Sequence, residues 1–213
     1  QTNASITPTL PGDYYVIVSN NSCSDVQSNT IRIIANPNIT IQTDQIICEG
    51  DTYTITSNNT NASLNTNVTY EWYKDGLPTG ITTPSYDVNA SNQTVNTTAT
   101  YYLVATEQNT CTFTSNTVSV TINALPVVNT TPILFEQCDY IPSTLDGIAE
   151  MNLTSLYDII TNATPGLTLY YYQDAGLTNA ITNPTNYSNT SSPFNQTIYV
   201  KAVNEAITPN CTS

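Results

Sequence analysis

YYLVATEQNTCTFTSNTVSVTI, residues 101–122, places two runs of alternating apolar and polar residues on either side of a polar turn that carries Cys111. Alternation with a period of two residues, rich in Tyr, Val, Ile and Thr, is typical of half-buried strands. A turn made of Asn, Gln and Thr between two such runs indicates a hairpin. The stretch therefore predicts a β-hairpin with a cysteine in its turn.

The same hairpin occurs three times in the chain. Residues 14–34, YYVIVSNNSCSDVQSNTIRII, repeat the whole pattern, and residues 198–211, IYVKAVNEAITPNC, repeat its first half. The three turn cysteines, Cys23, Cys111 and Cys211, follow one another at intervals of roughly 90–100 residues, which is the size of one immunoglobulin-like sandwich. The repeat predicts an all-β chain of tandem immunoglobulin-like β-sandwich repeats in an end-to-end array.

Two short junctions divide the chain into three expected modules. Residues 1–35 form the C-terminal part of a first Ig-like module, residues 36–123 a complete Ig-like module, and residues 124–213 an Ig-like module that lacks its last strand. The junctions contain proline and are only a few residues long, so they cannot act as flexible coils. Because the sequence starts inside a module and without methionine, we expect it to be an excerpt of a longer exported protein.

The third module is expected to begin with a strand at Val127–Phe135. Residues Gly147–Leu156 predict a second strand, with a short helical turn at Ser155–Ile160. Residues Gly166–Asp174 correspond to the strand of the second module that carries Trp72. This alignment places Tyr171 at the position of the tryptophan.

Charge and composition exclude several classes of function. The chain of 213 residues has 3 Lys and Arg, 16 Asp and Glu and no histidine, for a net charge of −13. No basic patch is available to neutralise phosphates or anionic lipids, so neither nucleic acid nor a membrane surface is an expected partner. No apolar run approaches the ~20 residues of a membrane span, and direct membrane insertion is not expected. Without histidine, a glycine-rich phosphate loop or a nucleophile elbow, we expect no catalytic residues and no enzyme activity.

The aromatic residues divide into an inward and an outward set. Trp72 lies in phase with Tyr70 on one face of its strand, which predicts a core residue between two sheets, and Tyr171 is its counterpart in the third module. Tyr170 and Tyr172 lie on the other face, where they are candidates for stacking against a glycan or a protein. Strand propensity and cross-strand pairing explain the outward tyrosines without any ligand, and this is the favoured interpretation.

Three acidic residues are the only candidates for a metal site. Asp139, Asp146 and Glu150 offer the hard oxygen ligands that calcium prefers. Their spacing matches no fixed loop motif, however, and solvated loop acids are the favoured explanation. We therefore expect no cofactor, with calcium as the alternative.

The five cysteines predict disulfides and an oxidising compartment. Counting by module suggests Cys48–Cys111 and Cys138–Cys211. In an Ig-like sandwich, however, Cys48 precedes the second strand at the far end of the module and Cys111 lies at the near end, roughly 20–25 Å away for strands of this length. A disulfide needs Cα atoms within about 7 Å. The far end of the second module adjoins the near end of the third, where Cys211 lies in the equivalent hairpin turn. We therefore predict a junction-spanning Cys48–Cys211 bridge, with Cys23, Cys111 and Cys138 paired outside this stretch of chain; the pairing within each module stays open as the alternative.

Several motifs together resemble a known group of modules. Cys-Glu-Gly-Asp at 48–51, YEWYKDG at 70–76 and TYYLVAT at 100–106 resemble the Ig-like repeats of very large secreted proteins of Bacteroidota. In the third module, DGIAEMNLT at 146–154 and QTIYVKA at 196–202 look like a repeat of flavobacterial type IX secretion substrates. Those proteins are similar to the gliding-motility-associated surface adhesins of this phylum.

The resemblance implies a non-catalytic repeat or stalk region of a large secreted cell-surface adhesin or gliding-associated filament. Its partners would be the neighbouring modules of the same chain. Two alternatives stay open: a module that binds surface polysaccharide or another cell-surface protein, and an accessory region of a secreted polysaccharide-degrading enzyme. All three place the chain outside the cell, at the cell surface.

Overall fold

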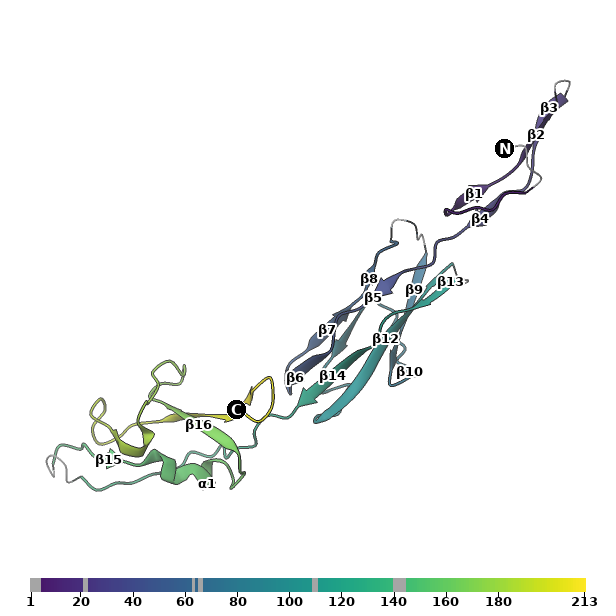
Figure 1. The fold of residues 1–213 in the computed structure, drawn as a ribbon. Coiled ribbons are helices and arrows are strands. Elements are labelled where there is room, and N and C mark those ends of the chain that lie inside the picture. The colour runs from purple at the N-terminus through teal and green to yellow at the C-terminus, as the bar shows by residue number, and fades with distance from the viewer. Residues whose placement is uncertain (1–4, 21–22, 63, 65–66, 109–110, 140–144) are drawn as a thin grey trace. The chain divides into compact units, whose positions relative to one another are not determined.

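The chain is described by a computed structural model that covers residues 5–20, 23–62, 64, 67–108, 111–139 and 145–213. It divides into two compact units (Figure 1). Unit 1 consists of residues 1–45 and 52–121, and unit 2 consists of residues 46–51 and 122–213. Each unit is described by itself below.

Strands dominate unit 1, and the helices all lie in unit 2. Unit 1 contains β1 (Gly12–Tyr14), β2 (Ile17–Asn20), β3 (Cys23–Gln27), β4 (Ile31–Ile33), β5 (Ile39–Thr40), β7 (Tyr53–Thr56), β8 (Asn58–Asn59), β9 (Val68–Lys74), β10 (Leu77–Pro78), β11 (Ser85–Val88), β12 (Thr97–Glu107) and β13 (Cys111–Thr114). Strands β6 (Gln45–Cys48) and β14 (Val118–Asn123) run from unit 1 into unit 2. Unit 2 contains β15 (Glu150–Met151), the 3-10 helix η1 (Leu153–Leu156), α1 (Tyr157–Ile160), β16 (Leu167–Tyr172), the 3-10 helix η2 (Pro184–Asn186), β17 (Tyr187–Ser188), β18 (Tyr199–Asn204) and β19 (Cys211–Thr212).

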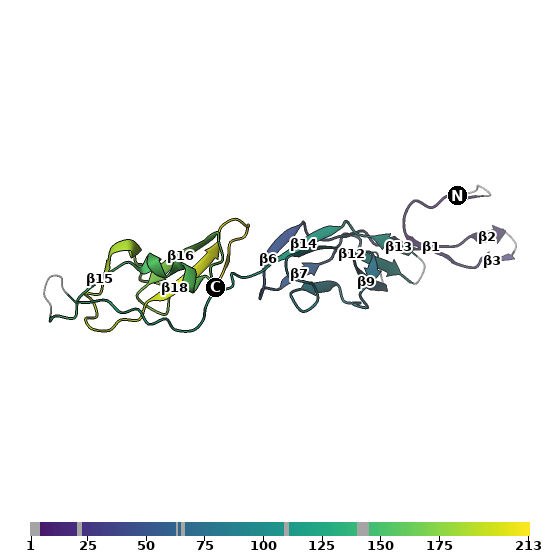
Figure 2. The ribbon, with the colours of Figure 1, turned by 90° about the horizontal axis from the view of Figure 1, so that it is seen from below.

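The larger sheet has the strand order β10-β9-β12-β14-β6, with β13 paired to β12. Strands β9 and β12 are antiparallel, and their register sets Trp72 opposite Leu103. Strands β7 and β11 form a separate two-stranded sheet, and Figure 2 shows β7 beside the strands of the larger sheet. The all-β class and a hairpin within residues 101–122 are confirmed, but Cys111 does not lie in the turn as predicted: it begins β13, where it pairs with Glu107 of β12.

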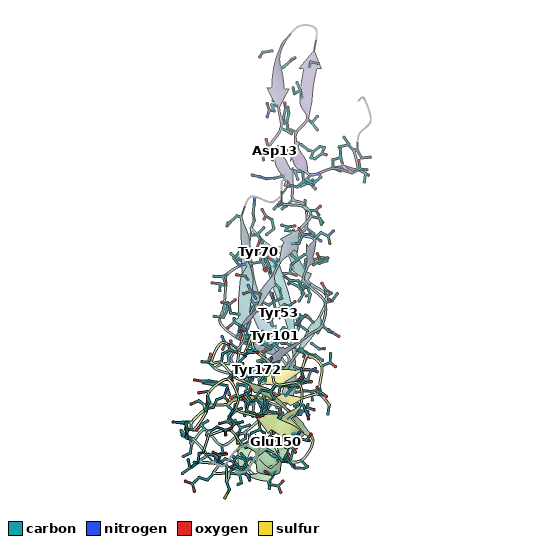
Figure 3. All side chains as sticks on the ribbon, turned by 90° about the vertical axis from the view of Figure 1, so that its left-hand side faces the viewer. Asp13, Tyr53, Tyr70, Tyr101, Glu150 and Tyr172 are labelled. Atoms are coloured by element: carbon teal, nitrogen blue, oxygen red, sulfur yellow. A yellow bond between two sulfur atoms is a disulfide. The ribbon has the colours of Figure 1, made fainter. Side chains whose placement is uncertain are left out.

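The core of unit 1 lies between these two sheets. The Trp72 ring centroid is 5.8 Å from that of Tyr86, which in turn is 5.4 Å from Tyr101, so rings from both sheets are in contact. Trp72 is 0% exposed. Burial alternates along β12 from Ala99 to Glu107, as a strand with one face on a core requires. Figure 3 labels Tyr101 among these strands.

One long hairpin, paired in two separate segments, occupies the first residues of unit 1. Strand β1 pairs with β4, and β2 pairs with β3. The hairpin expected from residues 14–34 is therefore present. Its apolar side chains are exposed on both faces, among them Ile17, Val18, Val26 and Ile31. These strands pack on no core of their own within the described residues of unit 1.

Unit 2 has shorter strands and a smaller core. Strands β16, β18 and β19 form one antiparallel sheet, and β15 pairs with β17. Leu153, Ile160, Tyr171 and Tyr187 make up its buried apolar cluster. Figure 3 labels Tyr172 and Glu150 on this unit. None of the helices in the described part of the chain has the length and apolar character needed to cross a membrane.

Two predicted strands of the third module are wrong or shortened. Residues 127–135 contain no strand, because the Asn129 side chain accepts a hydrogen bond from the Thr131 N–H (2.9 Å) and turns the backbone. The stretch predicted as a strand at 147–156 is extended only at Glu150–Met151. The Asn152 side chain then accepts the Thr154 N–H and starts a 3-10 helix there.

Candidate functional site

A disulfide joins Cys48, the last residue of β6, to Cys211, the first residue of β19. The sulfur atoms are 1.96 Å apart and the Cα atoms 5.5 Å apart, within the range for disulfides. The bond therefore confirms the Cys48–Cys211 pairing that was predicted from strand topology. Neither of the pairings suggested by counting cysteines within each module is the one formed. The bridge spans 163 residues of sequence.

The backbone around the bridge is held by hydrogen bonds on both of its sides. The Glu49 N–H donates to the carbonyl oxygen of Asn123 (2.8 Å), and the Cys211 sulfur lies 3.9 Å from the same oxygen. On the other side, the Cys48 N–H donates to the Asp51 carboxylate over 3.3 Å. Cys211 is only 1% exposed, so solvent and reductants have little access to that sulfur.

Hydrogen bonds also connect Cys211 to the sheet of unit 2. Asn204 in β18 is opposite Cys211, and it is also opposite Leu167 in β16. Beyond the bridge, the backbone groups of Ser213 and Ala202 exchange two hydrogen bonds of 2.8 and 3.0 Å. The Ser213 hydroxyl donates to the Pro126 carbonyl over 2.7 Å. The disulfide is therefore connected, through the pairing of β19 with β18 and of β18 with β16, to the strand that carries Tyr171. The supporting roles of Asn123 and Ser213 were missed from the sequence, because they act through backbone atoms or a common side chain.

Two further cysteines are free in the described part of the chain. Cys111 is half-buried at the start of β13, and Cys138 is exposed. The side chain of Cys23 lies outside the described residues. Their predicted pairing with cysteines beyond this stretch stays a prediction.

The tryptophan and tyrosines that the sequence singled out lie on the two expected faces. Trp72 is fully buried, and its indole N–H donates to the Thr83 carbonyl over 2.9 Å. Tyr171 is buried in the cluster of unit 2, and burial raises the pKa of its hydroxyl. Tyr170 on the other face of β16 is 43% exposed. Tyr172 is half-buried, and its strand partner in β18 is Tyr199.

The hydroxyl of Tyr170 is already engaged. It donates to the Glu205 carboxylate over 2.6 Å, and this hydrogen bond, together with the negative charge of Glu205, raises the pKa of Tyr170. In the proposed stacking pair, Tyr170 and Tyr172, the Tyr170 hydroxyl is therefore already hydrogen-bonded to a residue of a neighbouring loop.

Two of the three acidic residues considered for calcium accept local hydrogen bonds. Asp139 accepts the Gly147 N–H over 2.8 Å, and Asp146 accepts the Ile148 N–H over 3.0 Å. Glu150 is exposed in β15. Across the described residues, no group of three or more His, Cys, Asp and Glu side chains is gathered in a way that could hold a metal ion. The two aspartates thus act as acceptors that shape a loop.

Two family models match the chain in adjacent ranges. Residues 35–126 match the Ig-like domain described as CHU_C associated. Residues 134–213 match the Flavobacterium inter-domain disulphide bond domain. The observed bridge joins a cysteine of the first range to a cysteine of the second. A comparison with curated proteins finds no match.

Solved structures with Ig and fibronectin domains are similar to the chain at low identity. They include the N-terminal four Ig domains of Dscam1 isoform 7.44 (16% identity, TM-score 0.38, 53% of this chain and 27% of that one). Sidekick-1 immunoglobulin domains 1–5 match at 13% identity and a TM-score of 0.35, over 84% of this chain and 37% of that one. The chicken CNTN1 FN1–FN3 domains match at 11% identity and 0.35, over 90% and 67%. The chain spans about a quarter of the Dscam1 structure.

These findings agree on the coarse identity of the chain. Its fold is all-β and Ig-like, it contains a disulfide in the position the second family's description suggests, and both family models fit the resemblance to Bacteroidota repeats. The chain carries an Ig-like module of the Bacteroidota type that is suited to an extracellular or surface protein.

Proposed function

We propose that the chain is a non-catalytic repeat region of a large secreted surface protein, and that the Cys48–Cys211 bond carries its mechanical load. The observation that supports this role most strongly is the loop that the bond closes, which spans 163 residues. The family description of residues 134–213 and the absence of histidine from the sequence also favour a structural role over catalysis.

The covalent connectivity defines a path for force. Tension applied at residues 1 and 213 reaches Cys48, crosses the two sulfur atoms to Cys211 and leaves through the last two residues. Residues 49–210 lie inside the closed loop and receive no direct tension while the bond is intact. The folded core around Trp72 would therefore survive a pull that unravels an uncrosslinked chain.

An exported protein suits this chemistry. Disulfides persist in oxidising environments and are rare in the cytosol. The acidic chain, with 9% charged residues, takes its polarity mainly from uncharged side chains, and its three basic residues offer few sites to trypsin-like proteases. Both features fit a fibre exposed outside the cell.

Single-molecule force measurements test the mechanical role. Handles are attached at the two ends through peptide tags, so that no cysteine is consumed. The oxidised chain should extend only by residues outside the loop. After reduction, it should gain the length of 163 residues, or roughly 550 Å at about 3.3–3.6 Å per residue.

Cys48→Ser should behave like the reduced chain, and Cys138→Ser like the oxidised one. Release of the full loop length from the oxidised wild-type chain would contradict the proposal.

The location is tested separately on the source cells. Free thiols are blocked on intact cells with a membrane-impermeant maleimide, and the protein is then mapped without reduction. Cys48 and Cys211 should be recovered as one linked peptide pair. Recovery of both as unlinked thiols would place the chain in a reducing compartment and refute the surface role.

A further inference from the structure

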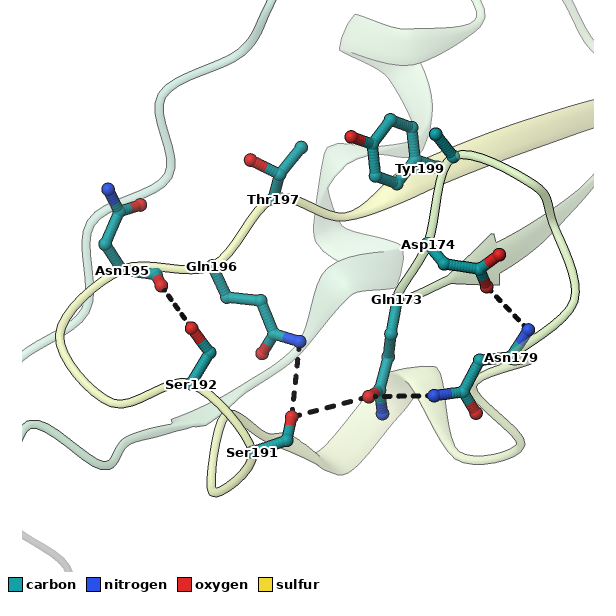
Figure 4. A pocket seen from close by; sticks show the side chains of 10 residues that line it. Gln173, Asp174, Asn179, Ser191, Ser192, Asn195, Gln196, Thr197 and Tyr199 are labelled. Carbon is teal, nitrogen blue, oxygen red and sulfur yellow. Dashed lines mark hydrogen bonds between the residues drawn. The ribbon is translucent and has the colours of Figure 1, made fainter.

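Unit 2 has an open, polar surface depression with a volume of about 530 Å³, called the cavity below, at the edge of the sheet where β16 ends and β18 begins. Its walls are the loop that follows Tyr172 and the loop that precedes Tyr199 (Figure 4). This volume falls within the roughly 300–1,000 Å³ of small-molecule sites. The side chains used in the argument below are Gln173, Asp174, Asn179, Ser191, Gln196 and Tyr199, all of which line the cavity.

The first wall is fixed by one carboxylate. Asp174 accepts the N–H of Asn179 over 2.6 Å, the N–H of Thr178 over 3.1 Å and the Thr178 hydroxyl over 2.9 Å. These hydrogen bonds, the one from Asn179 above all, hold the pKa of Asp174 below its ordinary value. The Asp174 carboxylate is therefore engaged by hydrogen bonds within its own loop, and these bonds fix the conformation of the loop.

The second wall is anchored by a buried amide. Asn189 is only 6% exposed, and its side chain accepts the Ala149 N–H over 2.8 Å and donates to the carbonyls of Gly147 (3.0 Å) and Ser192 (3.3 Å). The Ser192 hydroxyl then donates to the carbonyl of Asn195 over 2.8 Å. This loop is thus tied to the body of unit 2 before any ligand arrives.

A chain of side-chain hydrogen bonds crosses the cavity between the two walls. The Gln173 Oε1 atom accepts from Asn179 (3.2 Å) and from Ser191 (3.4 Å), as the dashed lines in Figure 4 show. Gln196 donates to the Ser191 hydroxyl over 3.4 Å and accepts from the buried Tyr187 hydroxyl over 2.6 Å. The amides are therefore oriented in advance, which lowers the entropy cost of binding.

Several polar groups at the cavity remain open to a ligand. Within the described residues, the Gln173 amide nitrogen, the Thr197 hydroxyl and the Tyr199 hydroxyl have no hydrogen-bond partner. Amide and hydroxyl groups offer both donors and acceptors, which matches a ligand rich in hydroxyl groups. Tyr199 is 37% exposed, and its ring offers an apolar surface for the C–H face of a sugar ring.

The charges of the site select among hydroxyl-rich ligands. The cavity is lined by no Lys, Arg or His, and the whole chain has a net charge of −13, so an anionic ligand is repelled. From these observations we infer that the cavity binds a neutral carbohydrate, with Gln173 and Thr197 contacting hydroxyl groups and Tyr199 packing against a sugar ring. This inference is independent of the mechanical role proposed for the disulfide.

Titration of the whole 213-residue oxidised chain with sugars tests the inference. The probes are neutral hexasaccharides of mannose, glucose (β-1,3-, β-1,4- and α-1,4-linked) and xylose, with oligogalacturonate as the anionic comparison. Binding is followed by calorimetry and by the NMR signals of the side-chain amides. At least one neutral probe should bind saturably and shift the amide signals of Gln173 and Gln196, and oligogalacturonate should not.

Variants locate the site. Tyr199→Ala should weaken binding about tenfold or more, since it removes a stacking surface worth about 1–2 kcal/mol. Thr197→Ala, a conservative change at an exposed position, should weaken binding about two- to tenfold without altering the fold. Tyr170→Ala is the matched control, because Tyr170 is an exposed tyrosine of the same sheet that does not line the cavity, and it should leave affinity within about twofold.

Three results would overturn the inference. One is no saturable binding of any neutral probe. The second is binding of oligogalacturonate alone. The third is binding that Tyr199→Ala and Thr197→Ala leave unchanged while Tyr170→Ala weakens it, which would transfer the site to the exposed face around Tyr170.

Discussion

The Ig-like part of unit 1 and the body of unit 2 achieve a folded state in different ways. In unit 1, a strand of 11 residues crosses a core whose central side chains, such as Trp72 and Leu103, are 0% exposed. In unit 2, the longest strands have 6 residues, and the core cluster is 4–8% exposed. The unit with the smaller core is the one that contains both cysteines of the disulfide.

The difference indicates that a disulfide can supply part of the folding stability that a larger hydrophobic core would otherwise supply. Small domains bury too little apolar surface to offset the entropy of the ordered chain, and crosslinks compensate by restricting the unfolded state. Unit 2 combines short strands, 3-10 helices and loops held by Asn and Asp side chains, all of which contribute little buried area. We therefore expect unit 1 to depend on its core and unit 2 to depend on the bridge.

Among the substitutions of core and surface side chains, Trp72→Ala should produce the largest loss of stability. Removal of a fully buried indole from between two sheets should reduce the free energy of unfolding by about 3–5 kcal/mol. Urea denaturation followed by far-UV circular dichroism measures the change, with Thr69→Ala, an exposed position of the same strand, as the control. A loss below about 1 kcal/mol would mean that unit 1 does not rest on this core.

Tyr171→Ala, the counterpart in unit 2, should cost less, about 2–3 kcal/mol in the oxidised chain. The substitution leaves an empty space in a smaller apolar cluster with half-buried neighbours, and these neighbours can move to fill it more easily than in unit 1. Amide exchange of β16 and β18 reports the local loss, and Tyr172→Ala on the opposite face is the matched control. A loss larger than that of Trp72→Ala would reverse the comparison between the two units.

Alkaline pH should weaken unit 1 through Tyr101. Burial, with Tyr86 and Asp75 nearby, raises the pKa of Tyr101 well above its ordinary value. A group with a raised folded-state pKa contributes its full stability below the unfolded-state pKa and loses it at higher pH, so stability should fall as the pH rises above about 10. Urea midpoints measured from pH 8 to 11 on thiol-blocked protein follow this fall.

Tyr101→Phe separates this effect from the titration of other tyrosines. The variant loses the 2.8 Å hydrogen bond to Gln93, which should cost about 1 kcal/mol at neutral pH, but its stability should decline less at alkaline pH. Equal slopes in the variant and the wild-type chain would assign the alkaline decline to other groups.

Tyr170→Phe should have the smallest effect. The hydroxyl that donates to Glu205 lies on the surface of unit 2, and surface changes of this kind usually alter stability by no more than about 0.5 kcal/mol. Thermal unfolding of the oxidised variant tests this. A loss above about 1.5 kcal/mol would show that surface hydrogen bonds, and not the bridge, hold unit 2 together.

Much of unit 1 could be predicted from the sequence because its signals are local and strong. The alternation in residues 101–122 gives the strand, its inward face and the turn at once. Topology favoured the Cys48–Cys211 pairing over the pairing within each module, since strand length separates the two ends of a sandwich by more than a disulfide can span. Neither argument needed the details of packing.

Apart from the disulfide, the structure of unit 2 was less predictable from the sequence, for a physical reason. Its loops are shaped by individual hydrogen bonds with backbone groups: the side chains of Asn129, Asn152 and Asp174 accept from backbone N–H groups, and the Asn189 side chain donates to a backbone carbonyl. The chain is so rich in Asn and Thr that the sequence does not distinguish a buried, loop-forming asparagine from an exposed one. The polar cavity is made by two such loops, so no sequence pattern indicated it. The apolar spacing of Val127–Phe135 predicted a strand that is not formed, for the same reason. There the Asn129 side chain accepts a backbone hydrogen bond and turns the chain.

Hydrogen exchange before and after reduction of the disulfide tests the central claim most directly. Closing a loop of 163 residues is worth about 5 kcal/mol in the chain-entropy model, and we expect unit 2 to lose most of that stabilisation when the bond is reduced. In the reduced chain and in Cys48→Ser, the amides of β16 and β18 should lose protection by orders of magnitude, while those of β12 keep theirs. Cys138→Ser should match the oxidised wild-type chain. Equal loss of protection in β12 and β16, or no loss in either, would contradict the account.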